Sequence, residues 1–391
     1  MINPTSITHQ LNPFPWYATM RASQPVAFDP ARQSWNVFRY EDVLRVLSDY
    51  TNFSSQLRRG PAQAATPDQP LATSLINTDP PRHRQLRTLV TQAFTPRSVE
   101  ALAPRITTIV HELLDTVAST GRMDIIHDLG YPLPVIVIAE LLGVPSADRE
   151  RFKHWSDAIV ATPPPGSPGN NAHGTAQREM GTYFVQMIEQ RRNSPGDDLI
   201  SALLKAQIEG EHLSVQELLG FCALLLVAGN ETTTNLIGNA LLCFTDHPGS
   251  WEQLRADRTL LPAAIEEVLR YRSPVQSMFR VAAQDTLIGD QQIPAGSFMV
   301  SWIGSGNHDE AQFPEPETFK LDRQPNRHLA FGQGVHFCLG APLARLEARI
   351  ALDLLLDRFE SIERVPDTVL VPLPSSIVYG VESLPVTFEA A

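Results

Sequence analysis

The stretch Phe331-Gly332-Gln333-Gly334-Val335-His336-Phe337-Cys338-Leu339-Gly340 decides the fold of this 391-residue chain. It places three glycines around one cysteine, directly before a segment with helical periodicity. Glycine lets a backbone adopt positive φ and approach another group closely, and a thiolate is favoured at the N-terminus of a helix. Two interpretations are open on local chemistry: an accessible thiolate on a tight loop, or an ordinary buried cysteine beside a turn, which is the commoner case.

Composition excludes several classes of protein. Acidic residues outnumber basic ones by 43 to 31, and the net charge of −12 argues against a general nucleic-acid binder. Three cysteines are too few for a disulfide framework and favour a reducing compartment. Residues 1–10 lack the features of a signal peptide, and no stretch is long and apolar enough for a membrane anchor. We therefore expect a cytoplasmic protein that binds neither nucleic acid nor membrane.

Helix dominates the predicted secondary structure, with short strands near both ends. We expect strands at 25–29, 35–40, 286–289, 298–302 and 369–388, and helices at 41–47, 82–94, 99–119, 135–142, 147–160, 177–192, 197–209, 214–246, 262–271 and 343–359. Segment 52–77 is predicted to be a long loop, and the proline-rich segment 162–171 a mobile loop or lid. No boundary divides the chain, so the prediction is one domain over residues 1–391, mainly α with small β-sheets.

The longest predicted helix carries an unusual polar interruption. It begins with a capping box of Ser214 and Glu217, and at 1.5 Å per residue it is about 50 Å long, so it must cross the core. Its middle reads Ala228-Gly229-Asn230-Glu231-Thr232-Thr233. Glycine costs a helix about 1 kcal/mol relative to alanine, and an acid in an apolar stretch is costly unless paired or solvated. The motif indicates either a bent or solvated helix face or a polar notch for chemistry.

Four motifs, in the right order, resemble those of the cytochrome P450 monooxygenases of the soluble bacterial kind. The stretch from Phe331 to Gly340 is similar to the haem-binding loop, and Ala228 to Thr232 is similar to the oxygen-activation motif. Residues 79–87 resemble the family's Asp-Pro-Pro-x-His-x-x-x-Arg, and Glu267-x-x-Arg270 resembles its structural ion pair. The resemblance implies a triangular, helix-rich fold with haem b between the long central helix and the cysteine loop.

The resemblance also implies roles for single residues. Cys338 would be the axial iron ligand, Thr232 would hydrogen-bond oxygen or a water at the iron, and Glu231 would pass protons from solvent. Arg323 would join the Glu267 ion pair as a structural residue. The remaining implied haem contacts, including the propionate ligands and the small residues beside oxygen, are His83, Arg87, Ala228, Gly229, Arg280, Phe331, Gly332, His336, Leu339 and Gly340.

The implied substrate and partners follow from the same resemblance. The implied substrate contacts are largely apolar, so we expect an apolar small molecule; they are Leu224, Val227, Ala228, Val275, Gln276, Met278, Ile377 and Val378. No flavin or iron–sulfur motif accompanies the sequence, so a ferredoxin and an NAD(P)H-dependent ferredoxin reductase would supply electrons. Acidic carriers would dock on a basic patch of Arg82, Arg84, Arg345 and Arg349, although each arginine can equally be an ordinary surface charge.

Alternatives remain open at this level. The chain can be a monooxygenase that hydroxylates or epoxidises with O2, a haem-thiolate enzyme that couples or rearranges its substrate, or a haem-binding sensor without turnover. The complete Ala-Gly-x-Glu-Thr motif favours turnover. Cys222 and Cys243 are predicted to be core residues. The histidines outside the motifs are in no metal-ligand spacing and are predicted to be solvated; they are His127, His154, His173, His212 and His247.

Overall fold

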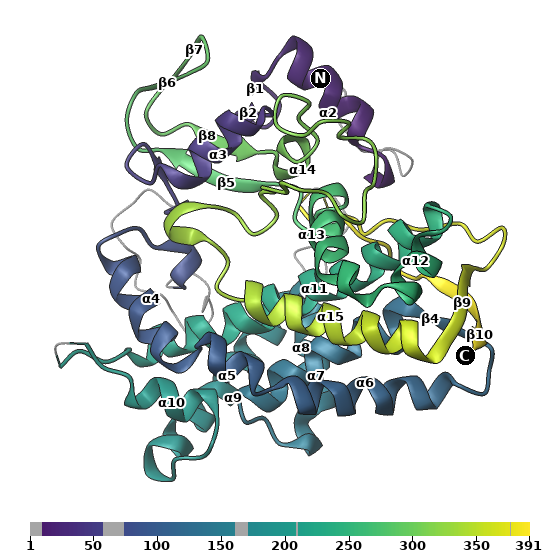
Figure 1. Cartoon of the computed structure of the whole chain (residues 1–391). Coiled ribbons are helices and arrows are strands. Elements are labelled where there is room, and N and C mark those ends of the chain that lie inside the picture. Colours follow the sequence, from purple (N-terminus) through teal and green to yellow (C-terminus); the bar gives the residue numbers. More distant parts are fainter. Residues whose placement is uncertain (1–9, 58–73, 161–170, 209, 376) are drawn as a thin grey trace. The chain divides into compact units, whose positions relative to one another are not determined.

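The computed structural model describes residues 10–57, 74–160, 171–208, 210–375 and 377–391 (Figure 1). The chain divides into two compact units. The first consists of Met1–Leu57, Arg105–Tyr131 and Thr232–Ala391, and the second of Arg58–Pro104 and Pro132–Glu231. Most of the predicted loop at 52–77, and the predicted lid at 162–171 up to residue 170, lie outside the described residues. The expectation of a single domain stays a prediction.

The first unit contains a five-stranded sheet. Its order is β1-β2-β8-β5-β3, with bounds β1 Val26–Asp29, β2 Ser34–Val37, β3 Phe53–Ser54, β5 Met278–Ala282 and β8 Phe298–Ser301. Strands β1 and β2 form an antiparallel hairpin, whereas β2 pairs with β8 in parallel. Fully buried side chains of Val37, Phe53 and Met299 form a core with Val43 of helix α3, Tyr40–Ser48. Apolar burial of this kind contributes about 25 cal/mol per Å².

Smaller sheets and helices complete the first unit. The second sheet has the order β4-β10-β9, and β6 pairs with β7. These strands are β4 Arg122–Asp124, β6 Thr286–Ile288, β7 Gln291–Ile293, β9 Phe359–Arg364 and β10 Pro385–Ala390. The helices are α2 Phe14–Ser23, α3 Tyr40–Ser48, α6 Ala103–Val117 (its first two residues belong to the second unit), α12 Ser250–Ala256, α13 Leu261–Tyr271, α14 Ile303–Gly306 and α15 Ala341–Arg358, with short turns η3 Ile125–Gly130, η5 Arg258–Leu260 and η6 Gly334–His336. Helices α13 and α15 pack together (Figure 1).

The described part of the second unit is mainly helical. Its helices are α4 Arg82–Ala93, α5 Pro96–Glu100, α7 Pro132–Leu141, α8 Arg149–Val160, α9 Asn171–Asn193 and α10 Leu199–Lys205, with short turns η2 Leu75–Asn77 and η4 Ser146–Asp148. Helix α8 packs against α7 and α9, and α10 packs against α4 and α9. Most of α7 is buried, as its continuous apolar sequence predicts.

Helix α11, Val215–Asp246, begins in the second unit and continues into the first. The predicted capping box is confirmed: the Ser214 N–H donates to Glu217 Oε2 at 2.9 Å, and the Glu217 N–H donates to Ser214 Oγ at 3.2 Å. Gly238 permits close packing, because a Cβ there would lie 2.6 Å from Cδ1 of Ile126. No helix in the described part of the chain is long and apolar enough to cross a membrane.

Three predicted elements differ from the structure. The helix expected at 99–119 is two helices, α5 and α6, because Pro104 is tolerated in the first turn of α6 but not in a helix interior. The helix expected at 197–209 ends at Lys205, and Ile208 then pairs with Glu211 in an isolated antiparallel bridge. The strand expected at 369–388 is regular only from Pro385, and its partner β9 was not predicted.

Candidate functional site

The cysteine loop closes on itself through backbone hydrogen bonds. The Cys338 N–H donates to the Phe331 carbonyl at 2.9 Å, and the Phe337 N–H donates to the Gly334 carbonyl at 3.1 Å. Cys338 is half-buried, whereas Cys222 and Cys243 are fully buried, as predicted. Burial raises the pKa of both of these thiols to about 12. Cys338 is therefore the thiol of this chain that a ligand can reach.

Glycines shape this loop at two positions. Gly334 has φ +70°, and a Cβ there would lie 2.8 Å from the Cα of Ser48, so the loop lies directly against the end of α3. At Gly340 a Cβ would lie 3.9 Å from the Cys338 sulfur, and α15 begins at the next residue. The thiol therefore lies just ahead of a helix N-terminus, where the free N–H groups favour negative charge.

Three more of the predicted residues belong to the same unit as the thiol. Arg280 lies on β5 with 4% of its surface exposed, and its Nη1 donates to the Phe279 carbonyl at 2.8 Å. His336 lies in η6, with its Nε2 2.9 Å from Ser55 Oγ. Thr232 is half-buried on α11. The first unit thus contains a thiol that can bind a metal ion, and a buried guanidinium and an imidazole that can pair with anionic groups of a ligand.

In the second unit, His83 and Arg87 lie four residues apart on α4, on one helix face. His83 is 1% exposed and Arg87 is half-buried. Burial and the charge of Arg87 lower the pKa of His83 to about 4, against the opposing effect of Asp79. A carboxylate ligand would offset both effects, so this face is suited to bind an anion.

The middle of α11 carries an accessible stripe on an otherwise buried helix. Leu224, Val227 and Glu231 are half-buried and Ala228 is exposed, and their spacing of three and four residues places them on one face. Burial raises the pKa of Glu231 to about 7. The stripe therefore combines apolar contacts with one carboxyl that exchanges protons near neutral pH.

Gly229 has a packing role that the sequence did not reveal. A Cβ at this position would lie 2.6 Å from Cδ1 of Ile138 on α7, so α7 packs directly on the glycine. Its expected role beside oxygen stays a prediction.

In the first unit, two of the predicted substrate segments lie side by side. Val275 and Val378 form an antiparallel bridge, and the Gln276 N–H donates to the Ile377 carbonyl at 2.7 Å. Val275, Met278 and Val378 are half-buried, and Ile377 is 37% exposed. The structure therefore brings together apolar side chains that are distant in sequence.

The side chain of Gln276 differs from this expectation. It is 5% exposed, its Oε1 accepts from the Tyr17 hydroxyl at 2.8 Å, and its Nε2 donates to the Ser273 carbonyl at 2.7 Å. Because the amide is held inside the core, we withdraw Gln276 from the expected substrate contacts.

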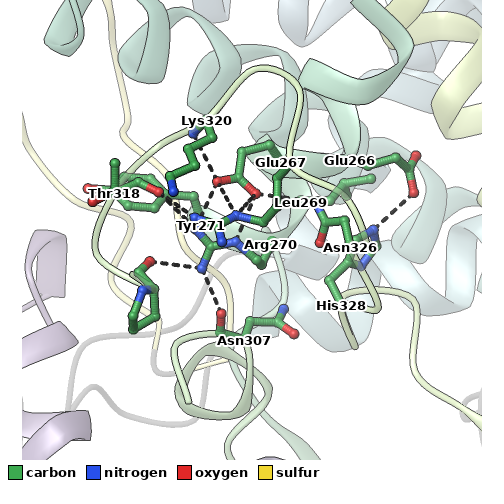
Figure 2. Close-up of polar contacts among 12 residues, drawn as sticks. Glu266, Glu267, Leu269, Arg270, Tyr271, Asn307, Thr318, Lys320, Asn326 and His328 are labelled. Atoms are coloured by element: carbon green, nitrogen blue, oxygen red, sulfur yellow. Dashed lines mark hydrogen bonds and ion pairs between the residues drawn. The ribbon is translucent and has the colours of Figure 1, made fainter. Parts of the chain in front are cut away.

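Figure 2 shows the ion pair between Glu267 and Arg270. Both side chains are fully buried, and Arg323 also pairs with Glu267. Glu267 accepts from Arg270 Nε at 2.8 Å and from Arg323 Nε at 2.9 Å. Lys320 N and Asn326 Nδ2 also donate to it, at 3.1 and 3.2 Å. The two guanidinium groups in turn donate to carbonyl groups of residues 307, 314, 315, 316 and 318. The network therefore ties α13 to the segment that leads into the cysteine loop.

The expected basic patch is weakened by the structure. Arg82 donates to Glu217 at 2.6 Å and to Glu211 at 3.1 Å. Arg345 donates to both oxygens of Glu266, at 2.7 and 2.8 Å. Both guanidinium charges are thus compensated within their own unit, and neither is an unpaired docking cation.

The prediction of solvated histidines is wrong for His247. Its ring is half-buried, its Nδ1 lies 2.8 Å from the Cys243 carbonyl, and it packs 4.9 Å from the ring of Phe319. His127, His154 and His212 are exposed, and the side chain of His173 lies outside the described residues. No group of three metal-ligating side chains occurs among the residues that the structure describes.

The donor set fits a haem. The first unit offers an accessible thiol at a helix N-terminus, Cys338, with a buried Arg280. The second offers His83 and Arg87 on one helix face. A cysteine thiolate is one of the ligands that hold haem iron in proteins, and each unit by itself offers cationic side chains of the kind that pair with carboxylates such as propionates.

Comparison with known proteins gives one consistent result. The family model for cytochrome P450 matches residues 28–379. Cytochrome P450 109 of Bacillus spizizenii is 45% identical over 96% of this chain and 92% of its own length. The crystal structure of substrate-free CYP109E1 from Bacillus megaterium has a TM-score of 0.93 at 46% identity, covering 98% of this chain and all of that one. The structure of CYP109E1 with testosterone has a TM-score of 0.91 at 46% identity, covering 98% of this chain and 99% of that one.

Proposed function

The chain belongs to the cytochrome P450 family, and on this premise we propose that it inserts one oxygen atom of O2 into a largely apolar small molecule, by hydroxylation or epoxidation. The family consists of haem-thiolate monooxygenases with haem b as cofactor, and the mainly α fold with small sheets agrees with it. The observation that carries the proposal is Cys338: it is the reachable thiol of the three and precedes the N-terminus of α15.

We propose that Cys338 binds the haem iron. When bound, the haem supplies O2 activation, and an axial thiolate donates electron density that favours O–O cleavage. The contribution of the chain is to hold the sulfur in place and ionised. The Cys338 N–H bond to Phe331 fixes the backbone, and the following helix N-terminus favours the thiolate over the thiol.

Cationic side chains are proposed to bind the haem propionates. His83 and Arg87 on α4, and Arg280 with His336 in the first unit, carry this role. Burial and the charge of Arg87 lower the pKa of His83 to about 4, and a propionate bound beside it would oppose both effects and favour the charged imidazole.

Thr232 and Glu231 are proposed to manage protons on α11. Burial raises the pKa of Glu231 to about 7, so this carboxyl can both take and give a proton near neutral pH. The Thr232 hydroxyl is proposed to donate a hydrogen bond to oxygen or to a water beside it, as the resemblance implies.

The proposed substrate is apolar and of small-molecule size. Leu224, Val227 and Ala228 on α11 are accessible apolar positions, and Val275, Met278, Ile377 and Val378 supply a second accessible apolar group in the first unit. Since CYP109E1 has been crystallised with testosterone and with corticosterone, steroids are the first class to test.

Electrons are proposed to come from a ferredoxin and its NAD(P)H-dependent reductase. Arg84 in the second unit and Arg349 in the first are exposed, and each is proposed as a separate contact for an acidic electron carrier. All three cysteines are outside disulfides, which supports a reducing cytoplasm as the compartment.

Oxygen uptake tests the proposed reaction. The holoenzyme is mixed with a surrogate ferredoxin and reductase, and NADPH-driven O2 consumption is measured with steroids, terpenes, fatty acids and macrolides that first give a type-I spectral shift. The proposal predicts a product carrying one oxygen atom from labelled O2. Product without oxygen incorporation would favour a coupling or rearranging enzyme. Reduced protein that binds CO but consumes no O2 with any ligand would favour a sensor.

A further inference from the structure

Arg345 contacts the residue that holds the Cys338 backbone. Its guanidinium carbon lies 4.5 Å from the centroid of the Phe331 ring, within the range of a cation–π contact. The carbonyl of the same Phe331 accepts the Cys338 N–H at 2.9 Å. One aromatic residue therefore links the Arg345 side chain to the backbone of the thiol.

Glu266 fixes the plane of that guanidinium. Arg345 donates through Nε and Nη2 to the two oxygens of Glu266, at 2.7 and 2.8 Å. A bidentate ion pair of this kind fixes the orientation of the guanidinium as well as its distance from the carboxylate. Burial acts to raise the pKa of Glu266, but the hydrogen bonds from Arg345 and His328 outweigh it and lower that pKa to about 2, so the carboxylate stays ionised.

His328 extends the arrangement to the start of the loop, and Figure 2 shows its pairing with Glu266. Its Nδ1 accepts the Ala330 N–H at 3.2 Å, so that nitrogen presents a lone pair. In the neutral ring, Nε2 then carries the hydrogen, and it donates to Glu266 Oε2 at 3.0 Å. The carboxylate therefore holds Arg345 on one side and the backbone just before Phe331 on the other.

The cluster also lines a surface cavity of about 550 Å³, together with Phe331 and Phe337. The Arg345 side chain is 38% exposed, so water and salt screen its ion pair. The main effect of the cluster is therefore expected on the geometry of Phe331 rather than on the stability of the whole chain.

We propose that Arg345, oriented by Glu266 and His328, is a positioning residue that holds Phe331 and thereby the iron-ligand loop. The inference rests on the proposed role of Cys338 as iron ligand. This role replaces the expected docking role of Arg345. The guanidinium stacks on Phe331 with one face and donates two hydrogen bonds to Glu266, so it is engaged by the loop and its neighbours.

The test compares Arg345→Met with Arg349→Met, which removes an exposed charge one turn later on α15. Each holoenzyme is reduced under CO, and the conversion of the red-shifted Soret band to the shorter-wavelength form is timed in mild urea. Arg345→Met is expected to convert about tenfold faster than the parent, a change of about 1.4 kcal/mol. Arg349→Met is expected to stay within about twofold, because interactions of an exposed charge contribute little to local stability.

Two further variants keep the test decisive if Arg345→Met folds poorly. Arg345→Lys keeps the charge but loses the fork and the flat stacking surface, so it is expected to convert nearly as fast as Arg345→Met. Glu266→Gln leaves Arg345 intact and is expected to accelerate conversion in the same direction. Thermal unfolding of each variant is measured alongside, and a change in conversion rate without a matching change in unfolding temperature supports positioning.

The outcomes separate this inference from the proposed function. If Cys338→Ser retains the red-shifted band, the iron-ligand assignment fails and this inference fails with it. If Cys338→Ser loses the band but Arg345→Met and Glu266→Gln convert at the rate of Arg349→Met, the positioning role alone is wrong. Full rescue by Arg345→Lys would show that charge, and not geometry, is what the loop needs, and would also overturn the inference.

Discussion

Replacing Glu267 with glutamine should destabilise the first unit more than any surface charge change. Oε2 of Glu267 accepts from Arg270 Nε at 2.8 Å, from Arg323 Nε at 3.0 Å and from Asn326 Nδ2 at 3.2 Å. Oε1 accepts from Arg270 Nη2 at 2.9 Å, from Arg323 Nε at 2.9 Å and from Lys320 N at 3.1 Å. Each oxygen therefore faces three donors.

The magnitude follows from this geometry. Whichever oxygen the amide group replaces, an NH2 then faces three N–H donors, and both guanidinium groups lose a compensating charge. Hydrogen bonds to charged groups contribute about 1.5–3 kcal/mol each, and breaking a buried ion pair by removing one partner costs about 3–5 kcal/mol. We expect a loss of about 3–5 kcal/mol, which is a large part of a typical total of about 5–15 kcal/mol.

Thermal unfolding followed by circular dichroism measures this loss. At about 2–4 °C per kcal/mol for a unit of this size, the unfolding temperature of Glu267→Gln should fall by about 10 °C. Glu315→Gln is the matched control, because the exposed Glu315 carboxylate pairs with Lys320 at the surface, and it should leave the transition unchanged. If Glu267→Gln unfolded at the same temperature as Glu315→Gln, the reasoning would be refuted.

Three further changes test other parts of the structure. Thr232→Ala should uncouple the enzyme and divert electrons to peroxide or water, measured as peroxide formed per NADPH; unchanged coupling would contradict its proposed role. Burial raises the pKa of Glu347 to about 8 from 4.5, so the folded state holds a proton that the unfolded state releases, and stability should fall as pH rises from about 5 to 8. Glu347→Gln should reduce that slope in unfolding experiments, whereas an unchanged slope would show that Glu347 is not its source. Gly334→Ala should destabilise the loop through positive φ, about 1–2 kcal/mol, and through a Cβ 2.8 Å from the Cα of Ser48. Gly121→Ala, with similar φ but nothing within 4 Å, should lose less haem on gel filtration, and equal losses would contradict the packing argument.

Local sequence signals predicted most of the helices. The capping box of Ser214 and Glu217 is formed within one helix turn, so the sequence contains all of its geometry. The spacing of Glu267 and Arg270 likewise predicted their pairing. Burial of that pair was not predictable from spacing, since it depends on carbonyl groups of residues 307, 316 and 318, which only the folded chain brings to Arg270.

Features that depend on distant segments were missed. Strand β9 exists because Phe359–Arg364 pairs with β10, more than twenty residues later, and nothing local marks it. Arg345 was expected at a docking surface, because its partner Glu266 is 79 residues away in sequence. Gln276 was expected at the substrate, but its amide bonds to Tyr17, 259 residues away. In each case the structure of the segment or side chain is set by a partner that is distant in sequence, and the neighbouring residues give no sign of that partner.

The reduced CO spectrum of Cys338→Ser tests the central claim most directly. Cys222 and Cys243 are fully buried in α11, so Cys222→Ser and Cys243→Ser serve as matched controls for loss of a thiol. The account predicts that the parent and both controls show the red-shifted Soret band and that Cys338→Ser does not. Retention of that band by Cys338→Ser would contradict the assignment of Cys338 as the iron ligand and the haem-thiolate chemistry proposed for this chain.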